Sequence, residues 1–253
     1  MQILVISDLL GAMDRVKEMA QKCSQYSLDA VCFCGNIVNG QARQAEWSQA
    51  QRDDRTPNRN QVGILQEALE DLRQYRIFCQ TLDSLGIPVL LVPGHLDAPE
   101  ERFFLFMQQA AFLSDNIVLL HENVTRVEKF IFTGFGGEIT PGDKEDYFLL
   151  KYPRQECIFG TRRMRFLNPP RIIIFHSPPI SKLDLEDGQH RGAPFVNEII
   201  DAVAPSFLFC GHVPTAWGME KIGETLVVNP GALALGQYAL VDTQEKSVQF
   251  LTL

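Results

Sequence analysis

The sequence predicts an α/β fold in which two mixed β-sheets face each other, with helices on the outside. Five apolar runs rich in β-branched and aromatic residues are bounded by Gly, Pro or polar residues, which is typical of buried strands. In the first half of the chain, amphipathic segments separate these runs, as helices do in parallel βαβ units. In the second half, short strand-like segments follow one another closely, which indicates antiparallel hairpins.

The first half is expected to alternate strand and helix. Strands are predicted at 3–7, 30–34 and 89–92, and helices at 14–25, 61–85 and 99–113. The long helix carries apolar residues at helical spacing, and Gly86 follows it where a C-cap glycine is expected. Residues 39–63 are strongly polar and contain no aliphatic run, so we expect an exposed insertion there. Such a connection could be a lid over a site or a solvated excursion.

The second half is expected to complete both sheets. Strands are predicted at 117–120, 124–133, 171–175, 207–210, 225–228, 238–241 and 247–252, with a helix at 194–203. The sequence shows no internal repeat, low-complexity segment or linker. We therefore expect a single domain over 1–253, with a polar and helical insertion at about 39–85.

The bulk composition limits the partners and the compartment. A net charge of −8 and a pI of about 5.2 argue against nucleic acid, because phosphate backbones attract basic surfaces. No signal peptide or membrane-length apolar run is apparent, so a cytoplasmic protein without membrane contact is expected. Cys32, Cys34 and Cys210 lie in apolar runs, where we interpret them as structural thiols. Cys32 and Cys34 could also be half of a metal site, but no second Cys pair answers them.

The ends of the five apolar runs carry residues that can bind metal or polar groups. Ligands of open α/β sheets bind outside the carboxyl ends of the strands. The residues expected at this edge are Asp8, Asn36, His95, His176 and His212. Three of the five histidines of the chain are in this set, which chance placement would not often produce.

The order of these motifs resembles that of the calcineurin-like metallophosphoesterase family, and the resemblance covers nearly the whole chain. The motifs are Ser7-Asp8-Leu9-Leu10-Gly11, Gly35-Asn36, Gly94-His95-Leu96-Asp97, His176 and Gly211-His212-Val213-Pro214. The resemblance implies a four-layer α/β/β/α sandwich and a hydrolase of phosphate esters. It also implies that Asp8, His176 and His212 belong to the catalytic site. The family includes symmetric oligomers, so a homo-oligomer that acts on a small phosphorylated molecule is expected.

Four positions depart from the family's pattern. Asn36 replaces the Asp that bridges two metal ions, and Leu10 and Pro214 replace histidine ligands of the first ion. Anionic ligands offset the repulsion between two close dications, and a neutral amide does so poorly. A second metal is therefore not expected. Asp8, Asn36, His95, His176 and His212 remain for one divalent ion, and their imidazoles favour Zn, Mn, Fe, Ni or Co over Mg or Ca.

The fourth departure is Leu96, which replaces the family's catalytic histidine. Leucine cannot donate a proton to a leaving group, and such help is typically worth about 10²–10⁴-fold in rate. Asp97 is the alternative candidate for this acid, although nothing in the sequence shows that it acts as one. The loop Pro93-Gly94-His95-Leu96-Asp97-Ala98-Pro99 also resembles a side-branch of the family in which Gly-Asn replaces Gly-Asp. Ligand loss would then be a trait of that branch.

Some polar residues have weaker claims to the site. Candidate substrate contacts are Asp97, His190, Arg191 and Asn229. His190 and Arg191 lie in a polar loop that could contact phosphate or simply be solvated. In the alternative interpretation, Asn36 is a turn residue and His95 makes hydrogen bonds within its loop rather than binding a metal. His121 precedes a predicted turn, so we expect it at the surface.

Three functions are compatible with these observations. The first is a weak or single-metal phosphoesterase, and the second is a non-catalytic binding or regulatory protein on the same scaffold. The third is a scaffolding role in which the 39–85 segment contacts a partner.

Overall fold

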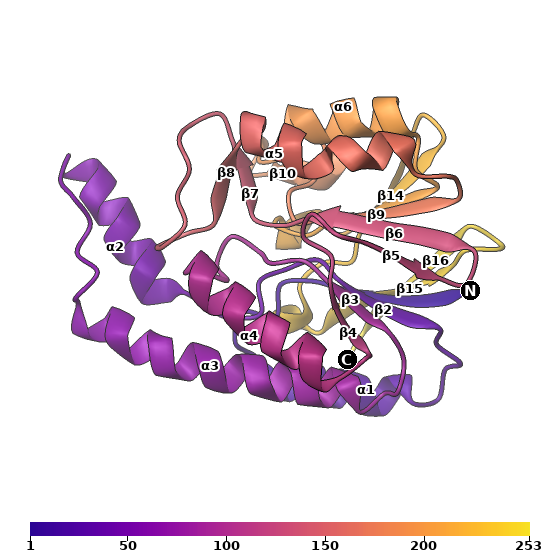
Figure 1. The fold of residues 1–253 in the computed structure, drawn as a ribbon, viewed down its shortest axis with the longest axis horizontal. Helices are drawn as coiled ribbons and strands as arrows, with labels where there is room; N and C mark the ends of the chain where they lie inside the picture. Colours follow the sequence, from indigo (N-terminus) through magenta and orange to yellow (C-terminus); the bar gives the residue numbers. More distant parts are fainter.

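Two six-stranded sheets pack face to face in the computed structural model, which describes residues 1–253 (Figure 1). The first sheet contains, in spatial order, β16 (Ser247–Thr252), β15 (Gln237–Asp242), β1 (Gln2–Ile6), β2 (Ala30–Phe33), β3 (Val89–Leu91) and β4 (Ile117–Leu119). Its strands β1 to β4 are parallel, and β15 pairs with β1 in the antiparallel sense. Helices α1 (Met13–Cys23), α3 (Val62–Asp83) and α4 (Glu100–Leu113) cover its outer face.

The second sheet has the same number of strands and its own helical layer. In spatial order it contains β13 (Gly218–Ile222), β14 (Thr225–Asn229), β12 (Phe207–Phe209), β9 (Arg171–Phe175), β6 (Phe130–Phe135) and β5 (Val124–Val127). Helices α5 (Arg154–Thr161) and α6 (Pro194–Val203) lie on its outer face, at the top of Figure 1. Two small sheets pair β7 (Glu138–Thr140) with β8 (Lys151–Pro153) and β10 (Leu185–Glu186) with β11 (Gln189–His190).

The apolar residues form three layers that alternate with the sheets. One layer lies between the two sheets and includes Val5, Cys32 and Phe209, and the other two lie between each sheet and its helices. The central strands are buried on both faces, which explains why they are continuous apolar runs in the sequence. The expected four-layer α/β/β/α sandwich is therefore confirmed. Cys32, Cys34 and Cys210 are buried free thiols.

The insertion is more regular than the sequence suggested. Most of its first part forms a helix, α2 (Gln41–Arg52), which packs against α3 and lies to the left in Figure 1, on the side of the strand ends. The sequence pattern does not reveal α2, because its buried residues are Arg43, Glu46 and Ala50, with no large aliphatic side chain among them. Hydrophobic periodicity cannot detect a helix that is anchored by ion pairs.

The strand expected at 124–133 is instead a hairpin, so that expectation was wrong in detail. β5 and β6 pair in the antiparallel sense around Glu128 and Lys129. Glu128 has a positive φ of 51°, which provides the reversal. The turn is not visible in the sequence, because neither residue is a usual turn former.

Glu128→Gly is expected to raise the free energy of unfolding by about 1 kcal/mol. An L-residue in the left-handed region is strained by about 1–2 kcal/mol, and glycine is not, although glycine orders at a greater entropic cost. Chemical denaturation of the variant and the parent measures the difference. Lys129→Gly is the matched control, because its φ is not positive, and it should be neutral or destabilising. A destabilised Glu128→Gly would contradict the assigned turn.

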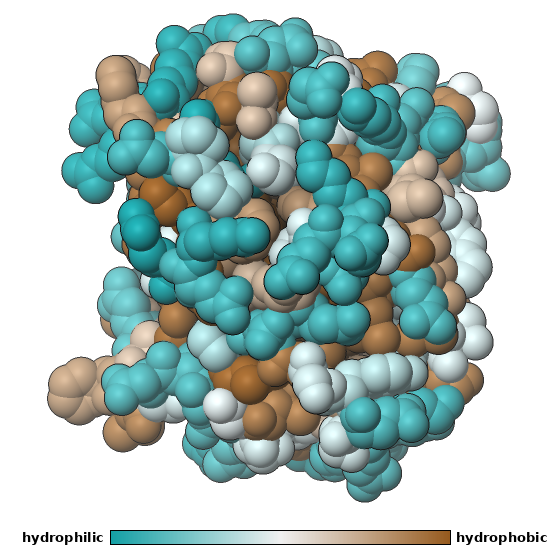
Figure 2. All heavy atoms as spheres, turned by 90° about the vertical axis from the view of Figure 1, so that its right-hand side faces the viewer, coloured by the Kyte–Doolittle hydropathy of each residue, from teal (hydrophilic) through white to brown (hydrophobic).

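The end of the sandwich opposite the carboxyl ends of the strands has a surface of both polar and apolar side chains. Figure 2 shows hydrophilic side chains over most of this face, with apolar side chains between them in separate patches. No helix of the chain combines the length and the apolar character needed to cross a bilayer.

Candidate metal centre

Three histidines from both sheets converge at the carboxyl ends of the strands. His95 follows β3 in the first sheet, and His176 and His212 follow β9 and β12 in the second. His95 Nδ1 lies 3.0 Å from His176 Nε2 and 3.2 Å from His212 Nδ1, and the last two atoms are 3.2 Å apart. The structure therefore brings together the three histidines that the sequence placed at this edge.

The tautomer of His176 is set by its second ring nitrogen. Its Nδ1 lies 2.7 Å from the carbonyl oxygen of Cys34, which can only accept, so Nδ1 carries the proton. Nε2 is then unprotonated and directs its lone pair at the other two imidazoles. Carbonyl–histidine pairs of this kind orient metal-ligating histidines in proteins.

Burial keeps the cluster neutral. It lowers the pKa of His176 to about 4, and that of His212 to about 4 with a further contribution from the nearby His176. Burial also lowers the pKa of His95 well below its ordinary value. Near neutral pH the three side chains are therefore uncharged, which is the form in which imidazole binds a metal.

The spacing of the three nitrogen atoms fits a single transition-metal ion. With metal–nitrogen bonds of about 2.1 Å, two ligand atoms are about 3.0 Å apart at a right angle and about 3.4 Å apart at a tetrahedral angle. The observed separations of 3.0–3.2 Å fall in this interval. Three converging imidazoles are also the donor set that suits Zn, Fe, Co or Ni.

Asp8 and Asn36 lie beside the cluster and bond to each other. Asn36 Nδ2 donates to Asp8 Oδ1 at 2.8 Å, and Asn36 Oδ1 accepts from the backbone N–H of Leu96 at 2.9 Å. A carboxylate accepts and an N–H donates, so both neighbours select the same orientation of the amide. Asn36 thus presents its nitrogen to the cluster side, whereas the sequence suggested a ligand through its oxygen.

Asp8 is held by two further donors. Its Oδ2 accepts from Ser7 Oγ at 2.7 Å and from the backbone N–H of His212 at 3.1 Å. Burial raises the pKa of Asp8, although these hydrogen bonds oppose the shift. Asp8 therefore fixes the backbone that carries His212, and its oxygens are not among the atoms that converge with the three imidazole nitrogens.

The strand ends approach so closely that glycine is required at two of them. A Cβ on Gly94 would lie 2.2 Å from the backbone N of Asn36, and one on Gly211 would lie 1.9 Å from Ser7 Oγ. Asp8, Asn36 and His212 adopt positive φ angles of 51°, 65° and 72°. Such backbone conformations are costly for residues other than glycine and concentrate at functional sites.

Asp97 holds the backbone of the two loops that carry Asn36 and His95. It is buried, and its carboxylate accepts from the backbone N–H groups of Asn36, Ile37, Val38 and Gly94. Burial raises its pKa to about 7, against the effect of these four donors. Because its oxygens face the backbone, its expected roles in substrate contact and proton donation gain no support from this geometry.

The other candidate substrate contacts are also engaged elsewhere. Asn229 is buried, and its Nδ2 donates to the carbonyl of Val213 at 2.9 Å, next to His212. His190 Nδ1 lies 2.8 Å from Asp184 Oδ1, and Arg191 pairs with Glu186 at 3.3 Å on the hairpin of β10 and β11. Asn229 therefore holds the loop of His212, and the other two order the hairpin.

Two residues near the strand ends differ from the sequence interpretation or escaped it. His121 was expected at the surface, but it is buried against Phe135, and its Nδ1 accepts from the N–H of Gly136. Lys151, on β8, lies close enough to lower the pKa of both His95 and His212, and it pairs with Glu138 at 3.1 Å. Neither lies in a motif, so only the folded chain reveals their surroundings.

Comparison with known proteins identifies the family to which this chain belongs. The family model of metallophosphoesterases of the calcineurin superfamily matches residues 1–253. A solved crystal structure superimposes with a TM-score of 0.90 at 30% identity, covering 99% of this chain and 98% of the other. A dimetal phosphatase from Danio rerio shares the fold, with a TM-score of 0.61 at 10% identity over 94% of this chain and 91% of its own. The uncharacterised protein MJ1162 of Methanocaldococcus jannaschii is 26% identical over 167 residues, 63% of this chain and 70% of its own length.

Proposed function

Because the chain belongs to the calcineurin superfamily of metallophosphoesterases, we propose that it hydrolyses phosphate esters with one divalent transition-metal ion held by His95, His176 and His212. The observation that carries the proposal is the convergence of three neutral imidazoles whose ring nitrogens lie 3.0–3.2 Å apart. When bound, such an ion polarises a phosphoryl oxygen and acidifies a water molecule.

The protein's own residues would orient the reactants. The carbonyl of Cys34 holds the His176 ring so that Nε2 stays free of a proton. The side chains of Asp8 and Asn36 bond to each other, Asn36 holds the backbone N–H of Leu96 in the His95 loop, and Asp8 holds the backbone N–H of His212. Lys151 lies beside the cluster, where its charge is paired with that of Glu138 at 3.1 Å.

We infer that catalysis is weak compared with a two-metal phosphatase. Leu96 occupies the position where the family's pattern has a proton-donating histidine, and its backbone N–H serves Asn36 instead. Asn36 brings an amide nitrogen, which cannot bridge two cations. The expected loss from the missing acid alone is about 10²–10⁴-fold in rate.

A non-catalytic binding protein is the second candidate. The observation that favours it is the Asn36–Asp8 hydrogen bond, which satisfies this part of the site without a second ion. In this case the three histidines would bind a metal without turnover.

Elemental analysis and a hydrolysis assay distinguish the two candidates. Protein purified without a tag or chelator is expected to contain about one equivalent of a transition metal, and to hydrolyse an aryl phosphate slowly but measurably. Metal without hydrolysis would favour the binding protein. Protein that takes up no Zn²⁺, Mn²⁺, Fe²⁺, Ni²⁺ or Co²⁺ would refute the metal centre.

A further inference from the structure

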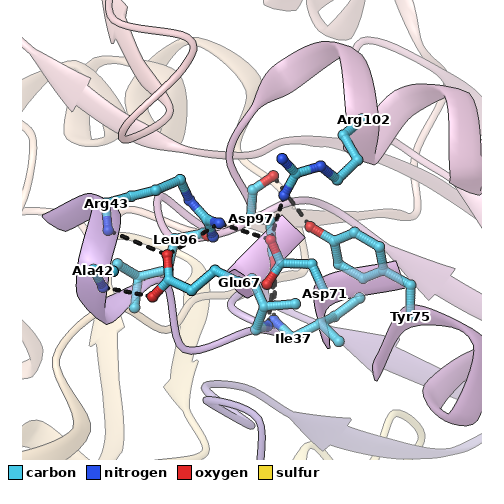
Figure 3. Close-up of polar contacts among 10 residues, drawn as sticks. Ile37, Ala42, Arg43, Glu67, Asp71, Tyr75, Leu96, Asp97 and Arg102 are labelled. Carbon is cyan, nitrogen blue, oxygen red and sulfur yellow. Dashed lines mark hydrogen bonds and ion pairs between the residues drawn. The ribbon is translucent and has the colours of Figure 1, made fainter. Parts of the chain in front are cut away.

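Arg43 is a fully buried arginine on α2, outside the metal centre. Its Nη1 donates to Asp71 Oδ2 at 2.7 Å and lies 3.3 Å from Glu67 Oε2, both on α3. Its Nη2 donates to the carbonyl oxygen of Leu96 at 3.3 Å. Figure 3 shows the guanidinium between the carboxylates of α3 and the loop that presents His95.

The loop from β3 to α4 is held at two neighbouring carbonyls. The carbonyl of His95 accepts from the backbone N–H of Leu150 at 2.8 Å. The carbonyl of the next residue, Leu96, accepts from Arg43, and the N–H of Leu96 donates to Asn36 Oδ1. These contacts leave the backbone around His95 little freedom, and so they determine where the imidazole lies.

Helix α2 makes one of these contacts and lies near the other. Through Arg43 it reaches the carbonyl of Leu96 directly. One turn further along the same face of the helix, the rings of Trp47 and Phe148 pack with centroids 6.0 Å apart, two residues before Leu150. The insertion therefore braces the His95 loop at Leu96 and packs beside the segment that holds the carbonyl of His95.

Helix α3 holds α2 in this position. Glu67 accepts from the backbone N–H groups of Ala42 and Arg43, in the first turn of α2, which has no side-chain cap of its own. Asp71 also pairs with Arg102 on α4, so the cluster contains two arginines and two carboxylates. The buried charges are balanced, as burial requires.

A buried ion pair is poor evidence for a gain in stability, because desolvation offsets the attraction. What this arrangement does supply is a fixed geometry, since the planar guanidinium can bond two carboxylates and a carbonyl at once. Lysine presents a single point charge and cannot reproduce that fork. The network therefore favours a role in placing the loop over a role in stability alone.

We propose that Arg43 is a positioning residue that fixes His95 within the three-histidine cluster. The proposal rests on the proposed function only in that the cluster binds a metal. Without the Arg43 contact, the carbonyl of Leu96 loses its buried partner, and the loop that places His95 beside His176 and His212 is held less firmly.

Cobalt binding tests this role. Co²⁺ absorbs visible light according to its coordination, so a titration gives both affinity and geometry. Arg43→Met is expected to weaken Co²⁺ binding by about 10–100-fold, as loss of a group that supports a ligand does, and to change the spectrum. Arg43→Lys keeps the charge between the carboxylates and is expected to lose less affinity. The lysine variant also tests the proposal if the methionine variant fails to fold.

The matched control is Arg55→Met. Arg55 pairs with Glu46 of α2 at 2.6 Å but makes no contact with the His95 loop. This variant should bind Co²⁺ as the parent does. A folded Arg43→Met protein with the affinity and spectrum of the parent would overturn the proposal.

A second readout does not depend on metal. In metal-free protein, Arg43→Met is expected to speed hydrogen exchange of the Leu96 amide, whereas Arg55→Met should not. If the parent binds no Co²⁺ but exchange still rises only in the Arg43 variants, the proposed function fails and the positioning role stands. Unchanged exchange in both Arg43 variants would refute the role of Arg43 independently of the metal.

Discussion

Replacing His176 by alanine is expected to abolish tight metal binding and, with it, phosphoesterase activity above the metal-free background. The variant removes one of three converging nitrogens and leaves the carbonyl of Cys34 without its partner. Loss of a supporting contact alone typically costs 10–100-fold in metal affinity, so loss of a ligand should cost at least about 10²-fold. Elemental analysis and an aryl phosphate assay on the same preparation measure both effects.

His121→Ala is the matched control for this experiment. It also removes a buried imidazole with a backbone hydrogen bond, but His121 is not part of the convergent cluster. Both variants should be destabilised, and only His176→Ala should lose the metal. Full activity in His176→Ala would place the chemistry elsewhere in the chain.

Replacing Asn36 by aspartate is expected to create a pair of carboxylates that a bound cation stabilises. Asn36 Nδ2 lies 2.8 Å from Asp8 Oδ1, so the variant would set two carboxylates against each other. Without metal, the lost hydrogen bond and the repulsion should lower the free energy of unfolding by about 1–3 kcal/mol. A bound divalent ion reverses the repulsion, and a ligand at 100 times its Kd adds about 2.7 kcal/mol of stability.

Thermal unfolding with chelator and with added Mn²⁺ measures this difference in stability. The stabilisation by Mn²⁺ should be larger in Asn36→Asp than in the parent. Asn229→Asp is the control, because it also changes a buried asparagine that donates to an oxygen, the carbonyl of Val213. Its gain from Mn²⁺ should not exceed that of the parent. An equal gain in Asn36→Asp and the parent would argue against a latent ligand at this position.

The sequence was sufficient to predict the layers of the fold and that the three histidines lie at one edge of them. Buried parallel strands are continuous apolar runs, and a residue that ends such a run must lie at the sheet edge. This logic placed His95, His176 and His212 together without any knowledge of how the strands are ordered.

The orientation of side chains could not be predicted in the same way. The amide of Asn36 is oriented by Asp8 and by the N–H of Leu96, which are distant in the chain. The surface position expected for His121 was wrong because its neighbours come from other elements. Helix α2 escaped detection because Arg43, rather than an apolar stripe, anchors it.

The placement of the three histidines has a consequence for unfolding kinetics. His95 belongs to one sheet and the other two to its partner, so an ion bound among them would act as a reversible crosslink across the sandwich. The two halves cannot separate until a metal–nitrogen bond breaks, whereas the separate strands can form before the site exists. Metal should therefore slow unfolding more than it speeds folding, so that loaded protein persists longer under forced unfolding.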